Sequence, residues 1–401
     1  MSHRIEITKE MLEKYISDNC MEFTLEEVEA LMDSEVEKPE DEMDTELVDM
    51  CAAVLAKAYN PDFKEGKPAE MYRPWEAENK NGAEVTESVR PDKKKVVPFR
   101  RILLVAAVLV IVGLNLAKYV IYGSYYAKKD DICINPGLGD GFICQGIAAA
   151  DRYEKILVSG YMQGKTASRI YVTDKNNESY YVTLASDGID FTGHAGGIAV
   201  TGDNAYIANG GKVYTVPLDS IINAEAGTSV DIGLGAEVNN RASYIYTDDK
   251  YIYVGEFHDG KNYIVEGHEY LTDEGRHSAV CSVYNIGDFS APVAVYSVRD
   301  KVQGIAFAED GTVVMSTSYG LSDSVFYVYN TGEATLSENT LDGAPVYYLD
   351  KPKKEVKGPA MSEGLDIYEG RVITLFESAS NKYIFGKLFF ADKIVSLDLI
   401  K

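Results

Sequence analysis

A short pattern typical of β-strands recurs five times along this 401-residue chain. Each copy has an apolar segment, a polar turn and a second apolar segment, as in QGIAAADRYEKILVSGY at residues 145–161. The other copies begin GGIAVTGDNAYIANGG (196–211), ASYIYTDDKYIYVGEF (242–257), QGIAFAEDGTVVMSTSYG (303–320) and EGLDIYEGRVITLFESA (363–379). A third apolar segment follows every copy. Units of this kind cannot bury an apolar face alone, so they must stack on their neighbours.

A fourth apolar segment follows four of the five units. These segments are 179–185 (SYYVTLA), 229–234 (SVDIGL), 292–298 (PVAVYSV) and 345–350 (PVYYLD). The fifth unit ends with the chain, and a strand from about 125–134 would complete it and leave no open edge. Four strands per unit at a period near 50 residues predict an all-β five-bladed propeller, with six blades as the alternative.

Small residues occupy the same place at the start of each unit, where backbones would converge at the centre of a ring. They are Gly146, Gly197, Ser243, Gly304 and Gly364. Over residues 135–401 this blade pattern resembles the broad β-propeller superfamily found in YVTN-type and lactonase-like secreted proteins. The resemblance lies in the blades, and no family-specific active-site motif accompanies it.

One uninterrupted apolar stretch, residues 102–122, precedes the repeats. It is long enough to cross a bilayer as a helix, which takes roughly 20 apolar residues. Basic residues crowd its N-terminal side between Arg90 and Arg101, and this bias predicts a cytoplasmic N-terminus. The alternatives are a buried helix and a cleaved signal peptide, but the preceding 101 residues are wrong for a signal peptide. We therefore expect a single-pass membrane protein with residues 123–401 outside the cell.

Residues 1–59 are acidic and predict short helices, one of which begins at the capping-box sequence TLEE at Thr24. Residues 60–101 are rich in proline and charge, and predict a disordered tether. This layout resembles that of bacterial transmembrane anti-sigma factors and related sensors. The resemblance implies a cytoplasmic protein partner for residues 1–59. A short tail without a signalling role is the alternative.

The net charge of the chain limits its classes of binding partner, and the positions of its cysteines predict which thiols are free. The formal net charge of −24 disfavours nucleic acid, because phosphates repel an acidic chain. Cys20 and Cys51 fall on the cytoplasmic side, where free thiols are expected. Cys133 and Cys144 fall outside, and the sequence leaves open whether they form a disulfide. Cys281 lies in an apolar strand and predicts a core position.

Polar side chains recur where each innermost strand starts and where each second strand ends. In a propeller these two ends share one face, which we call the mouth. The strand starts carry Gln145, His194, Asn240, Gln303 and Glu363. The strand ends carry Ser159, Tyr161, Asn209, Glu256, His258, Ser316, Ser318, Tyr319, Glu377 and Ser378. Convergent polar groups in a concave place predict a ligand site, with a water-filled channel as the alternative. The predicted ligand-binding set is Gln145, His194, Asn240, Glu256, Gln303, Tyr319, Glu363 and Glu377.

Three chemistries compete with plain binding at this mouth. Lactonase-type propellers hold calcium with Asp, Asn and Glu, and the Gln and His residues here depart from that set, so we expect no metal. Hydrolysis would use Glu363 and Glu377 as paired carboxylates, with His194 as acid, base or ligand. Nucleophilic catalysis would pair Ser378 or Ser318 with His194, but neither serine lies in a G-x-S-x-G turn.

The excursion at 258–278 adds tyrosines and polar groups that suit a sugar, a peptide or a protein surface. Its histidines, His258, His268 and His277, lie in a charged loop, and we expect them to be exposed rather than to form a metal cluster. The sequence thus predicts a bacterial-type cell-surface protein whose propeller binds an extracellular small molecule, glycan or protein at the mouth, rather than an enzyme. The alternatives are a membrane-tethered glycosidase- or lactonase-like hydrolase and a transmembrane regulator. Neither a cofactor nor the ligand can be identified.

Overall fold

The computed structural model describes residues 118–383 and 391–400 as continuous stretches, together with scattered positions between residues 7 and 54. The chain divides into two compact units, Met1–Lys94 and Lys95–Lys401. The predicted tether at 60–101 lies outside the described residues, as does the predicted membrane span at 102–122 apart from 118–122. Within the described part of the chain, no helix has both the length and the apolar character needed to cross a membrane.

In the first unit, residues from the predicted helical segments share one buried cluster. Leu12, Val28, Cys51 and Val54 are helical and fully buried. The helical spacing of apolar residues therefore gives faces that meet in a small core. Cys20 and Thr24 lie outside the described residues.

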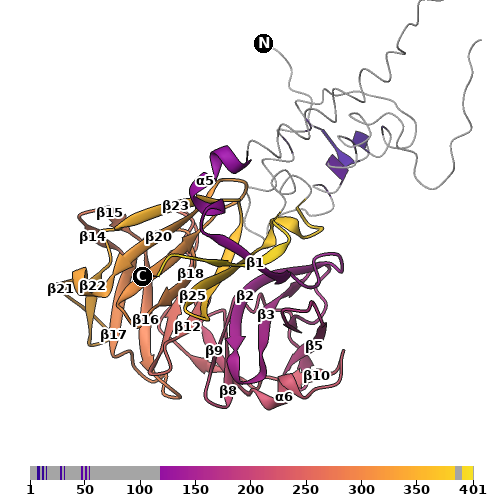
Figure 1. The fold of residues 1–401 in the computed structure, drawn as a ribbon, viewed down its shortest axis with the longest axis horizontal. Helices are drawn as coiled ribbons and strands as arrows, with labels where there is room; N and C mark the ends of the chain where they lie inside the picture. The colour runs from indigo at the N-terminus through magenta and orange to yellow at the C-terminus, as the bar shows by residue number, and fades with distance from the viewer. Residues whose placement is uncertain are drawn as a thin grey trace, which may run out of the picture. The chain divides into compact units, whose positions relative to one another are not determined.

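The second unit contains five antiparallel four-stranded blades that follow one another along the chain (Figure 1). The first two blades are β2 (Phe142–Ala150), β3 (Lys155–Met162), β4 (Arg169–Thr173) and β5 (Ser179–Ser186), then β7 (Gly197–Thr201), β8 (Asn204–Asn209), β9 (Lys212–Pro217) and β11 (Ala236–Glu237). The third blade is β12 (Tyr244–Thr247), β13 (Tyr251–Gly255), β16 (Ala279–Asn285) and β17 (Ala294–Val298). The fourth is β18 (Val302–Phe307), β19 (Thr312–Thr317), β20 (Ser324–Asn330) and β23 (Lys354–Gly358). The predicted all-β five-bladed propeller is confirmed.

The fifth blade joins the two ends of the propeller. It consists of β24 (Ser362–Tyr368), β25 (Arg371–Phe376), β26 (Lys393–Leu397) and β1 (Lys129–Ile134). Strand β1 pairs antiparallel with β26, from Lys129 opposite Leu397 to Ile134 opposite Lys393. The predicted closing strand at about 125–134 is therefore confirmed, and it removes an open edge.

Backbones of adjacent blades meet at the start of the innermost strands. These strands contact one another around a closed ring in the order β24, β2, β7, β12 and β18. A Cβ atom added at Gly146 would lie 2.6 Å from the backbone N of Ile198 in the next blade. One added at Gly304 would lie 2.6 Å from the backbone N of Leu365. Real Cβ atoms do not approach so closely, so the ring requires glycine at these two places, as the repeat predicted.

Two of the four predicted outer strands belong to a different blade from the one expected. Strand β10 (Ser229–Asp231) pairs in parallel with β5 of the first blade, and β22 (Ala344–Tyr348) pairs in parallel with β17 of the third. The true fourth strands of the second and fourth blades are β11 and β23. An apolar alternation marks a strand without specifying its partner, which explains the error.

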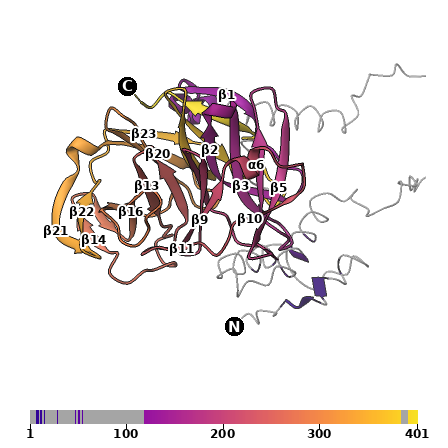
Figure 2. The same ribbon diagram turned by 90° about the horizontal axis from the view of Figure 1, so that it is seen from below.

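The added strands thicken the outer edge of the third blade. Strand β22 forms a hairpin with β21 (Thr335–Leu341), and β14 (Tyr270–Thr272) pairs with β15 (Gly275–His277). Both views place β14, β21 and β22 together at this edge (Figures 1 and 2). Tyr270 packs there with Val280, Val295 and Val346 in a separate apolar cluster. The smaller connecting elements are α6 (Asp219–Ile222), β6 (Ile189–Asp190), and the 3-10 turns η1 (Asp151–Tyr153) and η2 (Thr331–Glu333).

The chain enters the propeller between its fourth and fifth blades. Helix α5 (Gly123–Tyr126) lies against β23 (Figure 1). The Tyr125 ring is buried against Phe326 of β20 and Phe376 at the end of β25. The Tyr122 hydroxyl donates a 2.8 Å hydrogen bond to Asp323. Because Asp323 immediately precedes β20, this contact lies at the mouth end of the fourth blade.

All four described cysteines are free thiols. Cys133 lies on β1 and Cys144 on β2, in different blades, so they are not joined. The Cys144 thiol is fully buried and receives a 3.1 Å hydrogen bond from the Asn135 side-chain amide. Cys281 is fully buried in the largest core, as predicted.

Candidate functional site

Three blades begin with a β-bulge at the mouth, and each bulge holds a residue that the sequence singled out. The register shifts between Cys144 and Gly146, between Val302 and Gly304, and between Ser362 and Leu365. The extra residues are Gln145, Gln303 and Glu363 with its following glycine. A bulge leaves its extra residue outside the ladder and redirects its side chain. The recurring Gln-Gly or Glu-Gly dipeptide is thus the sequence form of this bulge.

Two of these residues meet the end of β25 and form the centre of a polar cluster. The Gln145 Nε2 donates to Glu377 Oε2 at 3.1 Å and to the Cys144 carbonyl at 3.0 Å. Glu377 opens the short 3-10 turn η3 (Glu377–Ala379) that follows β25. Glu363 is 2% exposed, and its Oε1 has no hydrogen-bond partner among the described residues. We call the full set the mouth cluster: Gln145, Tyr161, His194, Glu363, Glu377, Lys382 and Tyr383.

Burial raises the pKa of both carboxyl groups of the mouth cluster. Burial raises the pKa of Glu377 to about 7, while Lys382, Tyr383, His194 and Gln145 oppose that rise. Burial and the neighbouring charge of Glu377 raise the pKa of Glu363 well above its ordinary value. Burial therefore favours the protonated form of Glu363, which can donate a hydrogen bond, while the pKa of about 7 places the titration of Glu377 near neutral pH.

An aromatic and cationic rim surrounds these carboxyl groups. The rings of Tyr161 and His194 stack with centroids 4.6 Å apart and planes 27° apart. The Lys382 ammonium donates to the Tyr161 hydroxyl at 2.8 Å and lies 5.1 Å from that ring's centroid. Burial, together with nearby Glu377, raises the pKa of Tyr383 well above its ordinary value. His194 itself is exposed.

The sequence reasoning missed Lys382 and Tyr383. They follow the 3-10 turn η3 in the sequence SASNKY, where no strand pattern points to the mouth. Only their position shortly after Glu377 in the chain links them to it.

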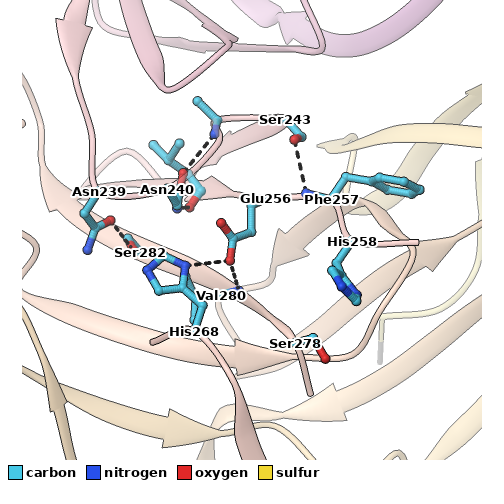
Figure 3. A network of polar contacts seen from close by, with 12 residues as sticks. Asn239, Asn240, Ser243, Glu256, Phe257, His258, His268, Ser278, Val280 and Ser282 are labelled. Carbon is cyan, nitrogen blue, oxygen red and sulfur yellow. Dashed lines mark hydrogen bonds and ion pairs between the residues drawn. The ribbon is translucent and has the colours of Figure 1, made fainter. Parts of the chain in front are cut away.

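Two predicted ligand-binding residues lie elsewhere and are held by the fold. The Asn240 side chain donates to the Val254 carbonyl at 2.7 Å and accepts from the Ala242 backbone at 2.9 Å (Figure 3). Glu256 is buried, and its Oε1 accepts from His268 at 2.7 Å and from the Val280 backbone at 3.0 Å (Figure 3). Both side chains therefore stabilise the third blade. The Glu256 Oε2 has no partner among the described residues.

The prediction that the three histidines of the excursion are exposed is wrong. His258, His268 and His277 are 4%, 3% and 2% exposed. Their ring nitrogens lie 3.3 Å from Asp300, 2.7 Å from Glu256 and 3.3 Å from Glu274, respectively. The β14–β15 hairpin folds the excursion onto the third blade, and its charged composition does not reveal this packing. Desolvation lowers the pKa of His277.

The serines at the strand ends connect neighbouring blades. Ser159 donates to the Ala195 carbonyl at 2.8 Å, Ser316 to the Glu363 carbonyl at 2.7 Å and Ser318 to the Ser362 carbonyl at 2.9 Å. The Ser318 hydroxyl proton is therefore committed to the backbone. Ser378 is buried, and its Oγ has no partner among the described residues.

The last two predicted residues, Gln303 and Tyr319, lie in the fourth blade. Gln303 is half-buried at its bulge, and Tyr319 is 47% exposed beside Lys301. Neither belongs to the mouth cluster. Across the described part of the chain, no group of three or more His, Cys, Asp or Glu side chains is placed to hold a metal ion.

No protein-family model matches the chain, and no curated protein sequence matches it. Solved structures with similar folds include the PQQ-bound form of an aldose sugar dehydrogenase from Streptomyces coelicolor. It is 14% identical to this chain, the match covers 62% of this chain and 79% of that one, and the TM-score is 0.37. A putative glucose dehydrogenase from Thermus thermophilus shares 12% identity over 67% of this chain and 99% of its own, with a TM-score of 0.38. BamB from Moraxella catarrhalis shares 8% identity over 63% and 82%, with a TM-score of 0.28. Such distant likenesses carry no argument about this chain's site.

Proposed function

We propose that the propeller binds a polar extracellular ligand at the mouth cluster. The observation that carries this proposal is the buried Glu363 carboxyl, whose Oε1 has no partner among the described residues. A buried polar group without a partner costs about 1–3 kcal/mol. A ligand group that reached Glu363 would remove that cost. Gln145 and Glu377 would then orient the ligand.

The chemistry of the cluster suits a ligand rich in hydroxyl or amide groups. The Glu363 carboxyl donates when it is protonated, Glu377 accepts when it is ionised, and the Gln145 amide does both. The stacked Tyr161 and His194 rings supply a flat surface beside them. A glycan, a small polar molecule or a protein loop would meet these requirements.

Hydrolysis is the second candidate, because burial raises the pKa of two neighbouring carboxyl groups. Glu363 would act as the acid and Glu377 as the base or nucleophile, as in paired-carboxylate hydrolases. The hydrolysis proposal uses the same residues as the binding proposal, so a variant is needed that affects turnover and affinity differently.

We also propose that a membrane anchor at 102–122 carries the propeller outside the cell. The apolar length of that stretch and the basic residues before it support the proposal. Protease protection of the full chain in sealed membranes tests it. Cleavage within 123–401 only from the outer side is expected, and cleavage only from the inner side would contradict it.

A ligand is first identified by probing a glycan and peptide array with the full chain in detergent. Two substitutions at Glu363 then test binding and hydrolysis together. Glu363→Gln imitates the protonated carboxyl and should retain affinity, whereas Glu363→Leu should lower affinity about tenfold or more. Glu256→Gln, in the third blade, is the matched control and should leave affinity unchanged. Loss of turnover by Glu363→Gln with retained affinity would favour the hydrolase. Unchanged affinity of Glu363→Leu would contradict both.

A further inference from the structure

A second polar cleft lies on the mouth side of the fourth blade, apart from the mouth cluster. Its volume is about 220 Å³, and the loops before β18 and after β19 form its walls. Its lining includes Arg299, Lys301, Tyr319, Ser322 and Tyr327. We call it the rim cleft. It shares no residue with the mouth cluster, so it requires its own explanation.

The acidic side chains of the rim cleft are already engaged. Asp300 accepts a 3.1 Å hydrogen bond from the Ser278 backbone and lies 3.3 Å from His258. Asp323 accepts from the Tyr122 hydroxyl at 2.8 Å. Asp323 also lies 3.9 Å from the Lys357 ammonium, so both carboxylates have partners other than Lys301 and Arg299.

Lys301 is the cation that lacks a countercharge. No carboxylate lies within ion-pair distance of its ammonium group among residues 118–383 and 391–400, and the group sits 5.4 Å from the Tyr319 ring centroid. The backbone of Lys301 is fixed, because its N–H donates to the His258 carbonyl at 2.8 Å and its carbonyl accepts from Ser318 at 3.0 Å. It has a φ of 68°, a left-handed conformation uncommon for a non-glycine residue. The fold thus holds an unpaired lysine at the cleft in a strained conformation.

Arg299 presents a second donor to the same cleft. Its guanidinium carbon lies 3.3 Å from the centroid of the Tyr327 ring, and it forms an ion pair with Glu274. The Nε is buried and has no hydrogen-bond partner in the described part of the chain. A buried N–H of a charged group is costly to leave unpaired, so an acceptor is expected there.

We propose that the rim cleft binds an anionic group, such as a phosphate, sulfate or carboxylate, through Lys301 and Arg299. The chain as a whole has a net charge of −24 and repels anions, so an unpaired lysine beside an arginine Nε without a partner indicates a selective site. The Tyr122–Asp323 contact places the entering chain at the edge of this cleft. The anion is therefore either a free solute or a lipid headgroup.

Binding of inorganic phosphate to the full chain in detergent micelles tests the proposal, with phosphorus NMR line broadening as the readout. Lys301→Gln is expected to weaken binding about tenfold, which corresponds to about 1.4 kcal/mol. Arg299→Lys keeps the charge for Glu274 but removes the Nε donor, and should also weaken binding. Lys250→Gln is the matched control, since Lys250 also lies over a tyrosine ring, at 4.9 Å, but in the turn between β12 and β13 on the opposite face.

The outcomes are distinct if each variant keeps the unfolding temperature of the unchanged chain. Absence of phosphate binding up to millimolar concentration, or equal loss in Lys301→Gln and Lys250→Gln, would overturn the proposal. Nanodiscs separate the two sources of the anion. Weaker phosphate binding with phosphatidylglycerol than with phosphatidylcholine alone identifies a lipid headgroup, and equal binding identifies a soluble anion; both results support the site.

Discussion

Two glutamates occupy the same place in two blades, and their surroundings give them opposite roles. Glu377 follows β25 in the fifth blade, and Glu256 follows β13 in the third. The excursion after β13 brings His268 to Glu256 at 2.7 Å, which fixes the carboxylate as part of the fold. Among the described residues, the neighbours of Glu377 include Gln145 and a second carboxyl group, Glu363. The comparison shows that glutamates at the same blade position have different partners, according to which side chains pack against them.

The largest expected change in stability comes from removing the contact between His268 and Glu256 in the third blade. His268→Ala would leave the Glu256 carboxylate buried without its partner, which should lower the free energy of unfolding by about 3 kcal/mol. Denaturant unfolding measures the change. His194→Ala, at an exposed ring of the mouth, is the control and should change stability by less than about 0.5 kcal/mol. Equal effects of the two would remove the distinction between the blades.

Glu377, the glutamate at the mouth cluster, should make the stability of the fold depend on pH. The pKa of Glu377 in the folded chain is about 7, above the value of about 4.3 for an unfolded glutamate. Between these values the folded state binds more protons, so its stability falls as pH rises. Glu377→Gln should match the unchanged chain near pH 4.3 and become progressively more stable than it toward pH 7. Unfolding temperatures across this range test the prediction, and a difference that did not vary with pH would contradict it.

A smaller change in the free energy of unfolding is expected for Glu363→Leu. Most substitutions of buried residues destabilise a fold, whereas this one should not. Glu363→Leu replaces a buried group that lacks a partner by an apolar one of similar size, and should leave stability unchanged or raise it by up to about 2 kcal/mol. The same variant should lose ligand affinity. A destabilisation of more than about 1 kcal/mol in denaturant unfolding would mean that Glu363 is structural, like Glu256.

The smallest contrast lies between two buried serines near the mouth. Ser318→Ala removes the hydrogen bond to the Ser362 carbonyl and should cost about 1 kcal/mol. Ser378→Ala removes a hydroxyl without a partner in the described residues and should cost nothing or stabilise the fold slightly. Thermal unfolding of the two variants side by side tests whether the strand-end serines connect blades. The reverse order of stability would refute that role.

The repeat predicted the ring because its constraints are local. Steric crowding at the centre demands small residues such as Gly146, and a fifth unit with three strands of its own demands a closing strand such as β1. Those requirements can be read from spacing alone. Strands β10 and β22 were assigned to the wrong blade because their apolar alternation is the same whichever edge they join.

The mouth was predicted in part for a similar reason. Gln145 and Glu363 were found because the bulge leaves a dipeptide signature, and Glu377 because the second strand ends there. Glu256 also follows the second strand of its blade, as Glu377 does, and only the packing of His268 against it distinguishes the two positions. Lys382 and Tyr383 carry no pattern at all. Residue periodicity therefore places side chains on the mouth, but it does not tell which of them the fold has already used.

The most direct test of a ligand site at the mouth cluster is an experimental structure of the full chain purified from its native cells, with unbiased density calculated around Glu363 and Glu377. The account predicts density for a bound molecule within hydrogen-bonding distance of Glu363 Oε1 and the Gln145 amide, beside the stacked Tyr161 and His194 rings. Ordered water alone bridging Glu363 to the protein would contradict it and would make the mouth a solvated channel.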